Sequence, residues 1–201
     1  MRVGILGGTF DPIHSGHIAA AQAGLQCARL DEVLLVPAGL PPHKGAPHAS
    51  PEDRLQMCRL AVEGLPRIAV WDVEVGRPGS SFTVDTVLRF REERPTDTPL
   101  LLLGWDAAVQ IRSWDRWEQL LTLADLVVFP RPGLPEPEAR DLGRAGLGAA
   151  HLTICEEETP EVSATELRAL LVGGGALAGM VPGPVEDYIR VHGLYGSRVG
   201  G

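Results

Sequence analysis

The chain has 201 residues, of which 44% are hydrophobic and 22% are charged, a composition typical of a folded globular protein. Its formal net charge is 18 − 26 = −8, which argues against general affinity for nucleic-acid backbones. No apolar run reaches the ~18 residues that a membrane-spanning helix needs, and no signal-peptide core follows the first residues. The sequence therefore predicts a cytoplasmic protein that binds neither nucleic acid nor membrane.

Cysteine usage points to the same compartment. Cys27, Cys58 and Cys155 are odd in number and widely spaced along the chain. This pattern predicts neither a disulfide framework nor a zinc site built on cysteines. We therefore expect the thiols to be reduced.

Short apolar runs alternate with helical stretches along most of the chain. Most runs are continuous and rich in Leu or β-branched residues, as in strands that are buried on both faces of a parallel sheet. Helices are predicted over 18–30 and 114–124, after the start signal Ser50-Pro51, and after a cap at Ser81. The predicted strands are 3–6, 33–36, 68–71, 100–103, 126–129 and 152–154.

This alternation of strands and helices predicts βαβ units and an α/β fold, a Rossmann-like doubly wound parallel sheet. The pattern changes after about residue 160, where 164–171 and 184–192 are predicted to be helices with no strand between them. We expect 1–201 to form a single domain in which the part from about 160 to 201 is a small helical C-terminal appendix.

The strongest chemical signal is the segment 7–17, GGTFDPIHSGH, directly after the first predicted strand. Adjacent glycines let the backbone approach a ligand closely, and the start of the following helix offers N–H donors to anions. His14 and His17 are three residues apart, so a helical turn places both rings on one side, where they can donate to phosphate oxygens. The glycine spacing differs from the GxGxxG fingerprint, which disfavours a hydride-transferring dinucleotide enzyme.

The string GTFDPIHSGH resembles the (T/H)xGH signature of the nucleotidyltransferase α/β phosphodiesterase superfamily. Its members join a nucleoside triphosphate to a phosphorylated acceptor and release pyrophosphate. The string SATELR at 163–168 is similar to the second signature of the superfamily, a Ser-Ser/Ala-Thr-x-x-Arg segment at a late helix start. Taken alone it indicates a helix cap and a surface arginine. Together with the first motif it implies the second half of a triphosphate clamp.

Further segments are similar to the nicotinate-nucleotide adenylyltransferase family, and together the resemblance covers nearly the whole chain. The chain departs from the family pattern at three positions. Ala164 replaces the second serine of the common SST form, Trp105 is bulky, and Phe82 stands where many relatives carry tyrosine. None of these departures changes the expected reaction class. The similar segments are PPHK at 41–44, SFTVDT at 81–86, GWD at 104–106, RPG at 131–133 and the tail at 185–195.

The resemblance implies adenylyl transfer from ATP to nicotinate mononucleotide, giving deamido-NAD (nicotinic acid adenine dinucleotide) and pyrophosphate by in-line attack on the α-phosphate. It implies that His14, His17 and Arg168 are catalytic. Mg²⁺ is expected as a cofactor bound mainly through ATP phosphates and water, without metal ligands from the protein. The sequence permits a homo-oligomer and does not specify one. The expected ATP-binding residues are Gly7, Gly8, Thr9, Phe10, His14, His17, Ser163, Thr165 and Arg168, and the expected acceptor-binding residues are Lys44, Arg54, Thr83, Asp106, Trp114 and Arg131.

Plainer explanations stay open for single residues and for the function. Asp106 fits a helix cap, Trp114 fits a core aromatic, and Arg54 fits a solvated surface charge. The motifs nevertheless all follow predicted strands, and ligands of open α/β sheets bind beyond the carboxyl ends of the strands. Two other functions remain: a transferase of the same superfamily with another acceptor, such as phosphopantetheine, and a nucleotide-binding regulatory module without turnover.

Overall fold

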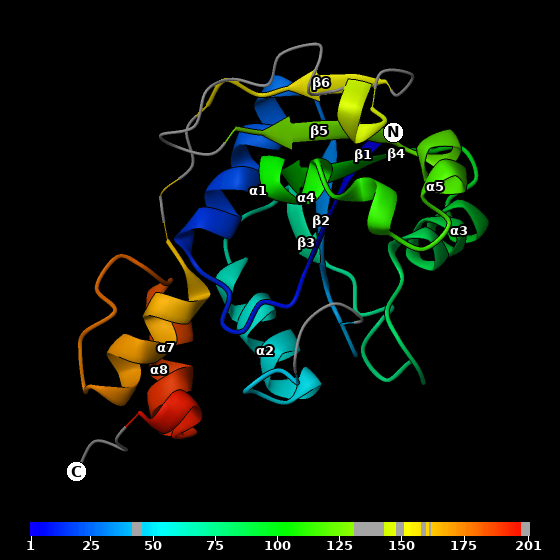
Figure 1. Cartoon of the computed structure of the whole chain (residues 1–201). Helices are drawn as coiled ribbons and strands as arrows, with labels where there is room; N and C mark the ends of the chain where they lie inside the picture. The colour runs from blue at the N-terminus through cyan, green and yellow to red at the C-terminus, as the bar shows by residue number, and fades with distance from the viewer. Residues whose placement is uncertain (42–45, 131–142, 148–150, 158–159, 161, 198–201) are drawn as a thin grey trace.

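The computed structural model describes residues 1–41, 46–130, 143–147, 151–157, 160 and 162–197 (Figure 1). Its centre is a sheet of six parallel strands in the order β3-β2-β1-β4-β5-β6. This order is that of a doubly wound fold, so the predicted fold class is confirmed. The strands are β1 (Arg2–Gly8), β2 (Glu32–Pro37), β3 (Ile68–Val70), β4 (Thr98–Gly104), β5 (Asp125–Phe129) and β6 (Leu152–Ile154).

The strands are buried on both faces, which explains why their sequences are continuous apolar runs. In β4, Leu100 and Leu102 belong to one core cluster, whereas Leu101 and Leu103 belong to the other. Side chains of a strand alternate between its faces, so each face needs its own apolar set. Ile5 of β1 pairs with Leu101 in this register and is 2% exposed.

Helices cover the two faces separately (Figure 1). The helices α1 (Ser15–Cys27) and α2 (Pro51–Ala61) pack on one face. The other face carries α3 (Thr83–Glu93), α4 (Trp105–Ala108) and α5 (Trp117–Leu123), with the 3₁₀ turn η1 (Ile111–Ser113). None of the helices described here has the length and apolarity that crossing a membrane requires.

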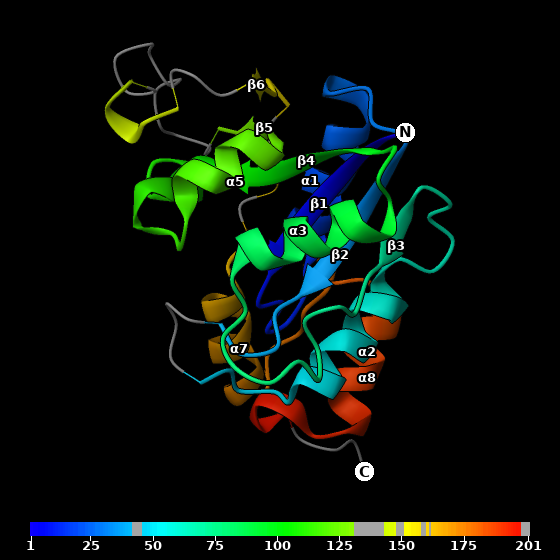
Figure 2. The ribbon, with the colours of Figure 1, turned by 90° about the vertical axis from the view of Figure 1, so that its right-hand side faces the viewer.

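The C-terminal part consists of α7 (Ala164–Val172), α8 (Gly183–Val191) and the 3₁₀ turn η2 (Leu194–Gly196). α8 lies beside α2 (Figure 2). The buried side chains of α7 and α8 belong to the core cluster that α1 and α2 share. The two predicted late helices are therefore confirmed, and they extend one face of the sheet.

Three predicted helix boundaries need correction. α1 begins at Ser15, three residues earlier than predicted, with His14 at the N-cap. α3 is preceded by Phe82 at the N-cap, and the hydroxyl of Ser81 instead accepts the N–H of Gly39 at 3.1 Å. α5 starts only at Trp117, because η1 forms a separate turn before it. In each case a contact from elsewhere in the fold or a tight turn decided the boundary.

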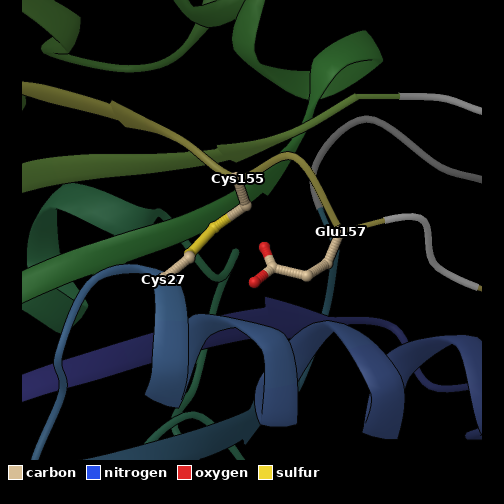
Figure 3. Close-up of side chains that lie close together, drawn as sticks. All are labelled: Cys27, Cys155 and Glu157. Carbon is tan, nitrogen blue, oxygen red and sulfur yellow. A yellow bond between two sulfur atoms is a disulfide. The ribbon is translucent and has the colours of Figure 1, made fainter.

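The prediction of reduced cysteines is wrong for two of the three. Cys27, at the end of α1, is joined by a disulfide to Cys155, which follows β6, whereas Cys58 is a buried free thiol (Figure 3). The partners are 128 residues apart in sequence, and only the packing of α1 across the sheet brings them together. In the chain-entropy picture, a link over so long a loop stabilises a fold by up to about 5 kcal/mol. A disulfide does not by itself define a compartment, so the cytoplasmic location stays a prediction.

Candidate active site

A cavity of about 1170 Å³ lies at the carboxyl ends of the strands, next to the ends of β1 and β4. The strand order reverses between these two strands, and open α/β sheets bind ligands at such a switch point. Segments far apart in the sequence converge here. The cavity is lined by residues 5–11, His14, Gly16 and His17 around the end of β1, by 101–107 at the end of β4, and by 162–166 and Arg168 at the start of α7, among others.

The two histidines of the first motif lie together at the start of α1. His14 is the N-cap residue, and its ring stacks on that of His17 with the centroids 3.6 Å apart. The Nδ1 atom of His17 accepts the backbone N–H of His14 at 3.3 Å, so the neutral ring of His17 carries its proton on Nε2. The buried ring of Phe10 packs on the ring of His17 in a T-shaped arrangement, with the centroids 4.9 Å apart. His17 is therefore held as a hydrogen-bond donor at the cavity wall.

The glycines of the motif make room for these rings. A Cβ atom at Gly8 would lie 2.8 Å from the ring of Phe10, so any side chain there would displace the ring that supports His17. A Cβ atom at Gly16 would lie 3.0 Å from the carbonyl oxygen of Pro160. Gly16 therefore lets the segment before α7 approach the start of α1.

Burial keeps the ring of His14 neutral near pH 7. It is 7% exposed, and burial lowers the pKa of its ring to about 4. The side chain of His14 faces the backbone N–H of His17 in a capping box, although its buried Nδ1 atom makes no hydrogen bond of full geometry among the described residues. The side chain of His17 accepts the backbone N–H of His14 in return. The two histidines therefore hold each other at the start of α1.

The lowered pKa of His14 predicts acid sensitivity of the fold. Between pH 6.5 and about 4 the unfolded chain binds a proton at this histidine and the folded chain does not, so stability falls as the pH drops through this window. We expect wild type to lose ~2–3 kcal/mol more than His14→Asn between pH 7 and pH 4.5. Urea unfolding of both proteins measures this difference, because all other titrating groups are shared. Equal losses would show that His14 titrates normally in the folded protein.

The second motif meets the first across the cavity. Ser163 is the N-cap residue of α7, and Thr165 lies in the first turn. The guanidinium of Arg168 donates from one nitrogen to the carbonyl oxygen of Asp11 at 2.6 Å, and from the other to the hydroxyl of Thr165 at 3.2 Å. These bonds use two of its five N–H donors. The fold therefore joins two motifs that are about 150 residues apart in the chain.

Arg54 lies beneath the site and not in it. Its side chain is fully buried and does not line the cavity. The guanidinium donates to the backbone carbonyl oxygens of Thr9 at 2.6 Å, Gly39 at 3.0 Å and Ala49 at 3.4 Å. The alternative of a solvated arginine is therefore wrong. The predicted contact with the acceptor stays a prediction, and the placement of Arg54 outside the cavity lining does not support it. Through its hydrogen bonds Arg54 links the loop that follows β1 to the loop that follows β2.

The remaining predicted acceptor residues divide into two groups. Thr83, Asp106 and Trp114 line the same cavity. Asp106 is not a cap, because Gly104 occupies the N-cap position of α4. Trp114 is half-buried and packs partly against the core, so the cavity and the core share it. Contact of these three residues with an acceptor stays a prediction. The second group, Lys44 and Arg131, lies outside the residues that the structure describes.

Comparisons with known proteins agree with this geometry. A model of the cytidylyltransferase-like family matches residues 5–170. The chain belongs to this family. It is 41% identical to a Pseudomonas entomophila protein named "Probable nicotinate-nucleotide adenylyltransferase", over 96% of this chain and 94% of that protein. A Symbiobacterium thermophilum protein of the same name is 40% identical, over 96% and 95% of the two chains.

Solved structures match this cytidylyltransferase-like chain over 99% of its length. A nicotinic acid mononucleotide adenylyltransferase of Plasmodium falciparum, complexed with NaAD, superposes with a TM-score of 0.81. The sequence identity is 20%, and the match covers 99% of each chain. At this identity the likeness shows the shared fold alone.

Several residues of the cytidylyltransferase-like site were not singled out from the sequence. The hydroxyl of Thr86 donates to Oε1 of the buried Glu74 at 2.5 Å, and both residues line the cavity. Asp11 lies inside the first motif, but its sequence context suggested no role for its carboxylate. No local pattern could reveal these partners, since each contact joins different elements of the fold.

Metal-ligand residues gather at the other end of α1. Within the described residues, Cys27, Cys155 and Glu157 bring one ligand atom each to within 4.8 Å of one another, with the carboxylate near the sulfur atoms (Figure 3). The sulfur atoms are joined in the disulfide and are not available as thiolates. This group lies almost the length of a thirteen-residue helix from His14, or ~18 Å. It is therefore separate from the candidate active site.

Proposed function

We propose that the chain transfers the adenylyl group of ATP to nicotinate mononucleotide, forming deamido-NAD and pyrophosphate in NAD biosynthesis. One observation carries the proposal: the stacked rings of His14 and His17 and the Arg168–Thr165 pair face one cavity, connected through Asp11. Such an arrangement suits a triphosphate that lies between two sets of donors. The names of relatives that are about 40% identical over nearly their full length support the same reaction.

The chemistry needs positioning and charge stabilisation more than a new nucleophile. The phosphate of the acceptor is already anionic and attacks the α-phosphorus in line, while pyrophosphate leaves on the opposite side. His17 is assigned to the α-phosphate, because its Nε2–H donor is fixed by the bond at Nδ1. Negative charge that grows on the α-phosphate then meets a donor that is already oriented.

The leaving group is assigned to the second motif. Arg168 has N–H donors beyond the two that hold it in place, and Thr165 lies beside it at the start of α7. An arginine suits the planar, bidentate recognition of phosphate oxygens. The backbone of residues 7–9 and the start of α1 add N–H donors near the other phosphates.

Mg²⁺ fits this site as an ion that is held by the nucleotide. The phosphate end of the cavity is lined by glycines, histidines and hydroxyls and by the carboxylates of Asp11 and Glu166. The carboxylate of Asp11 already accepts hydrogen bonds from His48, Ala49 and Tyr195. Triphosphate oxygens and water would therefore supply most of its ligands. The ion would neutralise charge on the phosphates, and the positioning would come from the protein.

The acid form of the acceptor is expected to be preferred. The far end of the cavity is built from the starts of α3 and α4 and from Trp114, which offers an aromatic face to a pyridine ring. Backbone N–H donors at such helix starts bind a carboxylate well, whereas an amide NH₂ group facing a donor would leave polar groups unpaired.

The test is a coupled pyrophosphate-release assay with ATP and Mg²⁺. Nicotinate mononucleotide, nicotinamide mononucleotide and phosphopantetheine are compared side by side at equal concentration. We expect rapid turnover with the first, and at least about tenfold lower kcat/KM with the second. Turnover with phosphopantetheine alone would keep the triphosphate clamp and overturn the acceptor. Binding of ATP with no turnover of any acceptor would favour the regulatory module.

A further inference from the structure

Asp11 is the point at which several parts of the site are joined. Its buried carboxylate accepts the backbone N–H groups of His48 at 2.8 Å and Ala49 at 3.0 Å, and the hydroxyl of Tyr195 at 2.9 Å. Its carbonyl oxygen accepts from Arg168 at 2.6 Å. One residue thus connects the first motif, the loop before α2, the second motif and the C-terminal tail.

The charge of Asp11 is stabilised by these donors. Burial by itself disfavours ionisation, but the hydrogen bonds from His48, Ala49 and Tyr195 outweigh it and lower the pKa of the carboxyl group. The guanidinium of Arg168 lies 3.9 Å from the carboxylate. Burial, followed by the charge of Asp11, raises the pKa of Tyr195, so its hydroxyl stays protonated and donates. Hydrogen bonds to a buried charge are among the stronger ones in proteins.

Backbone strain occurs at both ends of this connection. Phe10, next to Asp11, has a φ of 51°, and Tyr195 has a φ of 57°. Side chains other than glycine rarely adopt this left-handed region, and they persist there only where the surroundings hold them. The ring of Phe10 packs on His17. The contacts that hold the backbone at Phe10 therefore also fix the orientation of His17.

We propose that Asp11 is a positioning residue for adenylyl transfer and that Tyr195 is the remote anchor that fixes it. The inference rests on the proposed function and extends it to the C-terminal tail, 184 residues away in sequence. When the hydroxyl of Tyr195 is removed, the carboxylate of Asp11 loses a donor on the side of the tail. The backbone that carries Phe10 and the carbonyl that orients Arg168 are then less restrained. Both halves of the triphosphate clamp lose their relative alignment.

Tyr195→Phe tests this with two matched controls in the same tail. Tyr188→Phe removes a hydroxyl that donates to Asp53 at 2.9 Å, and Ser197→Ala removes one that donates to the carbonyl of Ile189 at 3.0 Å. Neither control contacts Asp11. The measurements are the Kd of a non-hydrolysable ATP analogue by calorimetry, kcat, the KM for ATP and the melting temperature of each protein.

We expect Tyr195→Phe to raise the Kd of the analogue about tenfold and to lower kcat by a similar factor, while both controls stay within about twofold of wild type. The melting temperature is expected to fall in all three variants. Equal effects of the three on Kd and kcat would overturn the proposal, since Tyr195 would then act only by holding the tail. So would an unchanged Kd and kcat in Tyr195→Phe.

The two proposals can fail separately. If wild type binds the ATP analogue but does not turn over nicotinate mononucleotide, the proposed function fails, and the Kd comparison still tests the role of Tyr195. If wild type is active and the three variants behave alike, the proposed function stands and the positioning inference fails.

Discussion

Replacing His17 by alanine is expected to lower kcat by about 100- to 1000-fold, with little change in the KM for ATP. The effect is this large because the Nε2–H donor is oriented before the reaction and meets charge that develops only as the α-phosphorus is attacked. The backbone of residues 7–9 and Arg168 also offer donors to bound ATP. The affinity for ATP before the reaction is therefore expected to change little when the donor of His17 is removed. Steady-state kinetics with both substrates varied separates kcat from KM.

A surface histidine supplies the control for this experiment. The side chain of His151 is 87% exposed and is not among the residues that line the cavity, so His151→Ala should leave both parameters unchanged. Unfolding of His17→Ala must also be recorded, since His17 packs on Phe10 and His14. A normal kcat in a folded His17→Ala protein would remove His17 from the mechanism. A rise in KM alone would assign it to ground-state binding.

Replacing Arg54 by methionine is expected to lower the free energy of unfolding by ~3–5 kcal/mol. The variant keeps much of the volume and removes the donors to the carbonyl oxygens of Thr9 and Gly39, which are partly buried, and of Ala49, which is buried. Carbonyls left buried without a partner carry the full cost of desolvation. Urea unfolding of wild type and variant measures the difference.

Arg59 on the same helix is the matched control for Arg54. It pairs with Asp72, and both side chains are more than half exposed. Such a pair contributes less than about 1 kcal/mol, so Arg59→Met should be nearly neutral. Arg54→Lys should recover part of the stability, because an ammonium group can reach one or two of the carbonyls but not all three. If Arg54→Lys were fully stable and only raised the KM for the acceptor, the buried structural role would be wrong.

Much of the architecture could be predicted from periodicity and composition. The six strands were predicted because both of their faces are buried, which makes continuous apolar runs such as Leu100–Leu103. Helix boundaries differ from the predicted ones where a turn or a distant partner competes with local preference. Ser81 has the residue type of a helix cap, but its hydroxyl accepts from Gly39 across the fold, so α3 begins later.

The candidate site was predictable where its function depends on local spacing. Gly7-Gly8 and the histidines at three-residue spacing belong to one strand-to-helix connection, so the sequence alone places them together. Arg54 shows the limit of this reasoning. An arginine in a helix with polar neighbours predicts a position at the surface or a contact with a ligand. Arg54 is instead a buried donor, because the loops after β1 and β2 pack around its guanidinium.

The sequence by itself determined the doubly wound sheet and the two phosphate motifs, because strand periodicity, helix starts and glycine pairs act over a few residues. Only the tertiary structure decided the Cys27–Cys155 disulfide and the contacts of Asp11 with Arg168 and Tyr195. These partners are between 128 and 184 residues apart, and a side chain carries no local mark of a partner so distant in the chain. Their contacts follow from the order of the strands in the sheet and from the helices that pack on each face.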